Sequence, residues 1–265
     1  MNRIIKTSLS VLGLAVASIS CTPTYNYASA PIDNVHAYRP KAKAGTDMAQ
    51  SISVSYDTQD EGYYEHDENL DYGQIDYNLS MRGDWSIHNL SASLGAGQYT
   101  IDNELSGRRD LFYTFLMGSY EFSAYTRYGS AGLEWRYIQM GFGGGSDMGA
   151  YAGTMRRFDG DLDSDTLDFN FSGSQIAHFY LATELNYALG SNSNMGLQLG
   201  FRQNLLSVEA FYAYPFTYLY YEHKNYGAFV GFNLYASTGR SNVIDGMYTK
   251  PATYTRPTFG VYYSF

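Results

Sequence analysis

The last ten residues read Arg256-Pro257-Thr258-Phe259-Gly260-Val261-Tyr262-Tyr263-Ser264-Phe265, and they decide the fold. Apolar or aromatic side chains stand at positions 259, 261, 263 and 265, with smaller or more polar ones between them. This period of two predicts a β-strand with one apolar face. The sequence stops on Phe265 with no polar tail, and an exposed aromatic at a strand end is typical of the interfacial girdle of a membrane barrel.

The composition of the whole chain points to the same class. The 265 residues include 28 Tyr, 15 Phe and 27 Gly, but only 16% are charged, where an ordinary globular chain has about 25%. The mean hydropathy of −0.32 excludes a bundle of membrane helices. We therefore predict an all-β fold, a transmembrane antiparallel up-and-down β-barrel. A soluble β-sandwich or β-helix is the alternative.

Alternation with a period of two recurs through the chain from residue 50 onward. We predict ten strands, because ten segments alternate in this way; eight or twelve strands stay open, since the patterns at 111–128 and 203–222 are ambiguous. The segments are 51–56, 74–81, 85–99, 111–124, 132–137, 178–187, 197–202, 211–222, 228–234 and 258–265.

The connections between these segments alternate between long and short. Outer-membrane barrels have short periplasmic turns and longer external loops. The rhythm therefore predicts a bacterial outer-membrane location with a periplasmic N-terminus and extracellular long loops. The short connections are 83–84, 125–130, 190–194 and 223–225, and the long ones are 58–72, 101–110, 144–172 and 238–255.

The closing strand also carries a motif, Thr258-x-Gly260-x-x-Tyr263-x-Phe265. It resembles the C-terminal β-signal of bacterial outer-membrane β-barrel proteins. In that family the signal is read by the barrel assembly machinery, so the resemblance implies two partners, that machinery and the outer-membrane lipid bilayer. The motif covers one strand and indicates a class of protein without indicating an activity.

The N-terminal region divides into two parts before the barrel domain of residues 50–265. Residues 1–20 carry two cations and a short apolar core, which predicts an export signal peptide. Cys21 follows a stretch resembling a bacterial lipobox, so we expect lipid attachment at Cys21; ordinary cleavage after Ala17 is the alternative. Residues 21–49 show no period and contain Pro23, Pro31 and Pro40, so we predict an extended linker.

Four charged residues fall on the polar faces of the predicted strands, and we expect them inside the barrel. A ten-stranded lumen is narrow and largely filled by side chains, and buried charges must be paired. The sequence therefore predicts a lumen ion-pair network, with a narrow pore as the alternative. Its members are Glu134, Arg136, Glu184 and Arg202.

Other activities find little support in the sequence. A net charge of −9 disfavours nucleic acid as a partner. The five histidines lie in no HExxH motif and no GxSxG motif is present, so we predict no enzyme and no cofactor. One acidic run is a weak calcium candidate, although Ser164 and Asn170 stand where a calcium loop needs Gly and Glu. Its acids are Asp159, Asp161, Asp163 and Asp165.

The predicted external loops are acidic and rich in tyrosine. Residues 57–71 contain seven carboxylates and no Lys or Arg. Exposed tyrosines bind sugars and protein surfaces through their amphipathic rings. We therefore predict a structural or adhesion-like role through these loops toward a surface ligand. A narrow diffusion channel for small solutes is the alternative, and an outer-membrane enzyme is a distant one.

Overall fold

The fold is taken from a computed structural model. It describes residues 38–43, 45–63, 66–103, 107–128, 132–150, 175–204, 214–237 and 252–265. Over these ranges the chain forms ten strands, as predicted. They are β1 (Met48–Tyr63), β2 (His66–Arg82), β3 (Ser86–Asn103), β4 (Gly107–Tyr128), β5 (Leu133–Met148), β6 (Gln175–Ala188), β7 (Ser193–Asn204), β8 (Tyr214–His223), β9 (Tyr226–Ser237) and β10 (Ala252–Ser264).

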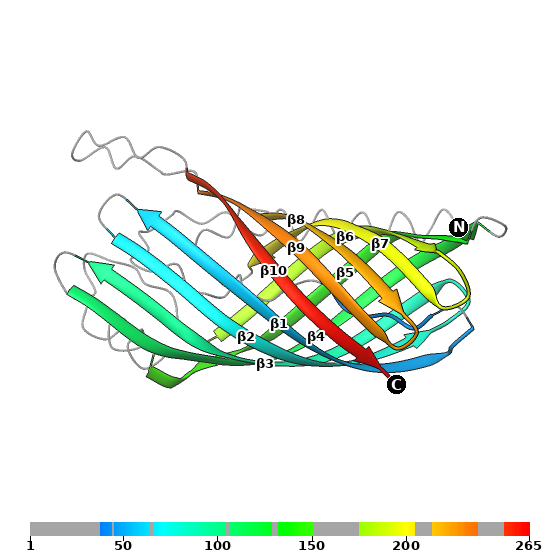
Figure 1. Ribbon diagram of the computed structural model, residues 1–265, viewed down its shortest axis with the longest axis horizontal. Coiled ribbons are helices and arrows are strands. Elements are labelled where there is room, and N and C mark those ends of the chain that lie inside the picture. The colour runs from blue at the N-terminus through cyan, green and yellow to red at the C-terminus, as the bar shows by residue number, and fades with distance from the viewer. Residues whose placement is uncertain are drawn as a thin grey trace, which may run out of the picture.

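The strands close into a single antiparallel barrel (Figure 1). Each strand pairs with its neighbour in sequence, and β1 closes the ring by pairing with β10, from Ser51 opposite Ser264 to Asp57 opposite Thr258. The all-β, up-and-down architecture predicted from the sequence is therefore confirmed. Closure matters physically because it leaves no strand edge with unpaired backbone groups.

Two predicted long loops are in fact strand. Pairing between β1 and β2 continues to Tyr63 opposite His66, and pairing between β3 and β4 continues to Asn103 opposite Gly107. The predicted loops at 58–72 and 101–110 were wrong because the apolar alternation stops there while the backbone ladder continues. Figure 1 shows these two hairpins projecting at the barrel end away from the C-terminus.

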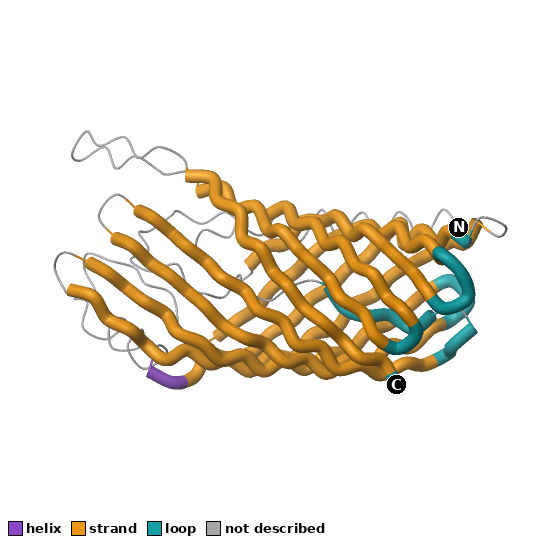
Figure 2. The backbone as a smooth tube through the Cα atoms, in the orientation of Figure 1, coloured by secondary structure: helices purple, strands orange, loops and turns teal. Residues whose placement is uncertain are grey.

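Short connections gather at the opposite end of the barrel, which we call the short-turn end. The turns at 83–85, 189–192 and 224–225 lie there, close to where the short connections were predicted. The amide of Phe265 donates to the carbonyl of Gln50 at 2.9 Å, which ties the end of β10 to the start of β1. Figure 2 shows these turns on the same side of the barrel as the C-terminus.

The outer face of the wall is apolar, the reverse of a soluble protein. In β10 the side chains of Phe259, Val261 and Tyr263 are 41–60% exposed while Thr258 and Tyr262 face the lumen and are buried. The same alternation holds around the ring. Aliphatic side chains form a middle band, with exposed Val54, Ile75, Leu94, Leu116, Leu185, Leu197, Leu199, Leu219 and Val261.

Exposed aromatic side chains border this aliphatic band on both sides. One row lies toward the short-turn end and includes Trp85, Trp135, Tyr187, Tyr221, Tyr226, Tyr263 and Phe265. The other row lies toward the projecting hairpins and consists of Tyr56, Phe112, Phe142, Phe201, Phe232 and Phe259. Two aromatic rows around an aliphatic band are the pattern of a barrel that meets lipid.

Glycines on the lumen side make room for aromatic rings from the neighbouring strand. A Cβ on Gly231 would lie 2.0 Å from the ring of Tyr218, and one on Gly260 would lie 2.2 Å from the ring of Phe229. Only glycine permits so close an approach. The high glycine and aromatic contents of the chain thus have a shared cause in the packing of the lumen.

The segment before β1 differs from the linker predicted for residues 21–49. Residues 38–43 lie inside the barrel, where Tyr38, Arg39 and Ala42 are buried, and β1 begins at Met48. The linker prediction was therefore wrong for residues 38–43, and its part from 21 to 37 lies outside the described residues. Within the described ranges, no helix is long and apolar enough to cross a membrane.

Candidate functional site

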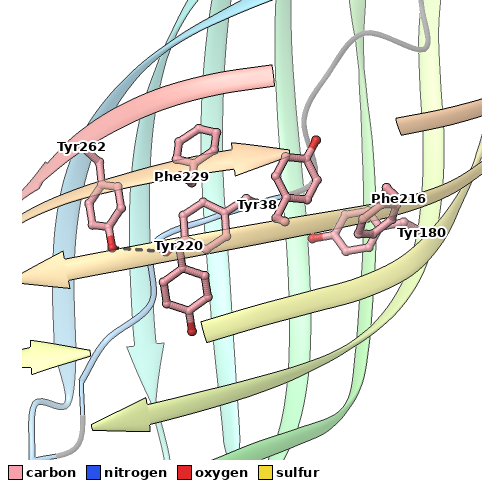
Figure 3. Close-up of a cluster of buried hydrophobic side chains, with 7 residues drawn as sticks. Tyr38, Tyr180, Phe216, Tyr220, Phe229 and Tyr262 are labelled. Carbon is pink, nitrogen blue, oxygen red and sulfur yellow. Dashed lines mark hydrogen bonds between the residues drawn. The ribbon is translucent and has the colours of Figure 1, made fainter. Parts of the chain in front are cut away.

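The candidate site is the lumen and the segment Tyr38–Lys43, which we call the lumen segment. Its first residue enters an aromatic cluster on one side of the barrel. The ring of Tyr38 lies 4.8 Å from the ring of Tyr220, 5.0 Å from that of Phe229 and 6.0 Å from that of Tyr262 (Figure 3). Its hydroxyl donates to the hydroxyl of Tyr262 at 3.3 Å. These rings come from β8, β9 and β10.

Two basic residues of the lumen segment, Arg39 and Lys41, face the other side of the barrel. The ammonium of Lys41 lies 3.2 Å from a carboxylate oxygen of Glu121 on β4 and 3.0 Å from one of Glu184 on β6. All three side chains are almost fully shielded from solvent. The guanidinium of Arg39 donates to Ser91 on β3 at 3.0 Å. Buried charges of this kind are stable only when paired in this way.

The backbone of the lumen segment is also bonded to the wall. The amide of Ala42 donates to the hydroxyl of Ser80 at 2.9 Å, and the guanidinium of Arg82 donates to the Ala42 carbonyl at 2.6 Å. Lys43 pairs with Glu222 on β8 at 2.9 Å. The segment therefore contacts β2, β3, β4, β6, β8, β9 and β10, which lie on all sides of the ring.

The predicted ion-pair network joins three of its four members. Arg136 donates to Glu134 at 2.9 Å and also pairs with Glu184. Glu134 additionally accepts from Arg82 and, at 3.2 Å, from Arg127. Adjacent strands hold these groups in place, and register shifts in β5 near Arg136 keep both Arg136 and Gln139 facing inward.

Arg202 lies apart from this cluster. Its side chain is buried on β7, and one guanidinium nitrogen lies 3.4 Å from the amide oxygen of Asn233 on β9. The prediction that Arg202 joins the glutamates was wrong. The reason is register, because Arg202 pairs with Tyr180 on β6, four residues away from Glu184.

Sequence reasoning missed two partners that complete the network, Lys41 and Glu121. Glu121 accepts from Asn89 and Ser123, each at 3.0 Å, and also from Tyr180. None of these groups is cationic, so the cation beside Glu121 comes from the lumen segment. The available signal was the alternating basic pattern at 39, 41 and 43, which has the period of an extended chain.

A cavity of about 240 Å³ opens beside the lumen segment near the short-turn end. Its walls include Tyr38, Lys41 and Lys43 of the segment, and Arg136 and Glu222 of the barrel. Members of the ion-pair network and of the lumen segment therefore border this space together.

The remaining predicted site residues have separate places. In the motif of the closing strand, the Thr258 hydroxyl donates to Asp57 at 2.8 Å inside the lumen, and Gly260 lies beneath Phe229. The rings of Tyr263 and Phe265 stack on the outer face with centroids 6.2 Å apart. Their role as an assembly signal stays a prediction.

Two other predictions fall outside what the structure describes. Cys21 and the calcium candidates Asp159, Asp161, Asp163 and Asp165 lie outside the described residues. Within the described ranges, no group of three or more His, Cys, Asp or Glu side chains is arranged to hold a metal ion.

Comparisons with known proteins give alignments of low similarity. No protein-family model and no curated protein matches the chain. The β-domain of the Bordetella autotransporter BrkA aligns at 11% identity, over 83% of this chain and 100% of that one, with a TM-score of 0.44. The translocator domain of the autotransporter NalP from Neisseria meningitidis aligns at 8% identity, over 82% of this chain and 87% of that one, with a TM-score of 0.44.

A third solved structure is an outer membrane channel from Pseudomonas putida F1. It aligns at 9% identity over 85% of this chain and 97% of that one, with a TM-score of 0.43. Similarity this low says nothing about the activity of this chain. The site must therefore be interpreted from its own geometry.

Proposed function

We propose that this protein is a bacterial outer-membrane β-barrel that is closed to diffusion and acts at the cell surface through its projecting hairpins. The apolar outer band between two aromatic rows supports insertion in a bilayer. Bacterial outer membranes are where closed β-barrels of this kind are found. The short-turn end then faces the periplasm and the hairpins face outward.

The main support for a closed barrel is the position of the lumen segment. It crosses the lumen and bonds to opposite sides of the wall, with Tyr38 on the aromatic side and Lys41 on the acidic side. Solute passage would require these buried contacts to break. A closed barrel of this size serves as a rigid support for what stands above the membrane.

The length and charge of the projecting hairpins support a role at the cell surface. A tilted membrane strand needs only about 9–11 residues, whereas β3 has 18 and β4 has 22. The β1–β2 hairpin beyond Tyr56 has an acidic sequence without Lys or Arg from 57 to 71. Its chemistry suits a basic partner surface.

Planar-bilayer recording tests the closed state. The full-length protein is reconstituted and recorded in molar KCl at moderate voltage. We expect no discrete current steps. Stable steps from the folded wild-type protein would overturn the closed barrel and favour a diffusion channel.

Adhesion of bacteria to poly-lysine-coated surfaces tests the surface role. The matched variant carries Asp60, Glu61, Asp67 and Glu68 changed to their amides, which keeps hairpin length and backbone. We expect the variant cells to adhere less at low salt. Equal adhesion at equal surface expression would contradict a role for the acidic hairpin.

The narrow diffusion channel is a second candidate because the cavity of about 240 Å³ at the short-turn end has charged walls. This candidate requires the lumen segment to move.

A further inference from the structure

We propose that the lumen segment Tyr38–Lys43 is a displaceable gate, and that the barrel conducts cations when the segment leaves. This goes beyond the closed surface barrel proposed above, because it assigns the protein a conditional transport activity. Three observations carry it: the charge balance of the lumen, the span of the wall contacts and the nature of the bonds that hold the segment.

The segment contributes a large share of the positive charge described in the lumen. Seven carboxylates of the wall are buried: Asp57, Asp76, Glu121, Glu134, Asp147, Glu184 and Glu222. The wall supplies four arginines to this lumen and its mouth: Arg82, Arg127, Arg136 and Arg202. The segment adds three cations, Arg39, Lys41 and Lys43, so it supplies three of the seven cationic groups counted here.

The described contacts within the wall do not join opposite sides of the ring. The side-chain bonds between strands join strands close together in the ring. Tyr220 on β8 donates to Glu184 on β6, and Gln198 on β7 donates to Gln139 on β5. The widest of those described above, from Arg82 on β2 to Glu134 on β5, spans three strands of the ten. Among the described residues, the contacts of the lumen segment reach farther across the ring, from Glu121 on β4 to Phe229 on β9.

The contacts that hold the segment are of a kind that can be exchanged. Each one is an ion pair, a hydrogen bond or a ring contact, and the segment adds no strand to the barrel. The barrel wall has its own complete ring of backbone pairs. Loss of the segment therefore removes the gate without opening the wall.

An emptied lumen would carry a negative excess near Glu121, Glu184 and Glu222. Fixed charge of one sign in a narrow, low-dielectric passage concentrates counter-ions. Rings of Asp and Glu are the usual basis of cation selectivity in pores. The expected permeant ions are small cations such as K⁺, with anions such as Cl⁻ disfavoured.

The test is planar-bilayer recording of Lys41→Glu in the full chain. The change places a third carboxylate beside Glu121 and Glu184, so we expect the segment to leave the lumen. The variant should show discrete current steps, and in a KCl gradient its reversal potential should shift toward that of K⁺. A folded Lys41→Glu barrel without current steps would overturn the proposal, and so would steps selective for Cl⁻.

Two further variants keep the test specific. Lys224→Glu makes the same charge change in the exposed β8–β9 turn, and it should stay closed. The double variant Lys41→Glu/Glu121→Lys restores an ion pair between the same two positions and should conduct at least tenfold less often than Lys41→Glu. Equal conduction by the double variant would contradict a gate held by this pair.

Folding is checked independently for every variant. Heat-modifiable migration in gels and the strand signal in circular dichroism report the closed wall. If Lys41→Glu does not fold, Lys41→Gln replaces it, and more frequent opening than in wild type is then required. Wild-type current steps would refute the closed barrel proposed above, whereas silent variants would refute only the gate.

Discussion

The two sides of the lumen use opposite chemistry to hold the same segment. The side formed by β2 to β6 presents carboxylates, including Glu121, Glu134 and Glu184, and meets Lys41. The side formed by β8 to β10 presents the rings of Tyr220, Phe229 and Tyr262, and meets Tyr38. The difference shows that the segment and the wall are matched in both polarity and shape, as partners in a specific interface are.

Substitutions on the two sides of the lumen should also destabilise the protein for different reasons. Loss of one partner on the acidic side leaves a charge without compensation in a poorly solvated place, which is costly. Loss of fit on the aromatic side costs packing, which neighbouring side chains recover in part. The following changes test this comparison, from the largest expected effect to the smallest.

Glu184→Ala should have the largest effect on stability. It removes the carboxylate that Arg136, Lys41 and Gln139 share, and the two cations stay buried. We expect a loss of about 3–5 kcal/mol in the free energy of unfolding, measured by urea titration in lipid vesicles. Asp71→Asn is the matched control, because Asp71 is exposed and accepts from Tyr56 on the outside; it should cost less than about 1 kcal/mol. Equal losses from both changes would contradict a buried network.

Gly231→Ala should have an intermediate effect on the aromatic side. The added methyl would meet the ring of Tyr218 at 2.0 Å, so the ring must shift. We expect a loss of about 1–3 kcal/mol in the same titration. Gly118→Ala is the control, since its nearest neighbour would be a backbone oxygen at 3.9 Å. A Gly231→Ala protein as stable as the control would show that the lumen rings have spare room.

Tyr38→Ala should act on the segment more than on the wall. It removes a ring that contacts four aromatic side chains. Aromatic pairs contribute about 0.5–1.5 kcal/mol each, and about 1.4 kcal/mol is a factor of ten. Hydrogen exchange of the Ala42 amide should therefore quicken by about tenfold or more. Tyr38→Phe keeps the ring contacts and loses the hydroxyl that donates to Tyr262, so it should change exchange by no more than about threefold. Equal rates in both variants would contradict aromatic anchoring.

Much of this fold was predictable because strand alternation is a local signal. The closing strand, the ring of ten strands and the short turns follow from residues near one another in sequence. The ends of β1 to β4 were not predictable in this way. The apolar alternation stops beyond the aromatic row on the hairpin side, whereas backbone pairing between the strands continues. Register placed Arg202 away from Glu184, and register is set by the whole ring.

The lumen segment was the main failure of sequence reasoning. Tyr38 to Lys43 has the composition of a solvated spacer, with Pro40 and three basic residues. Its burial depends on Glu121, Glu184 and Glu222, which come from strands far away in the chain. A linker and a buried segment differ only in what surrounds them, so local patterns cannot separate them.

Trypsin digestion of the folded protein in lipid vesicles tests this central claim most directly. The bond between Lys41 and Ala42 is a tryptic site that a solvated linker would expose. If the segment lies in the lumen, mass spectrometry should find this bond intact in the folded protein and cleaved in urea-unfolded protein. Rapid cleavage after Lys41 in a barrel that is still folded would contradict the placement of the segment inside the lumen.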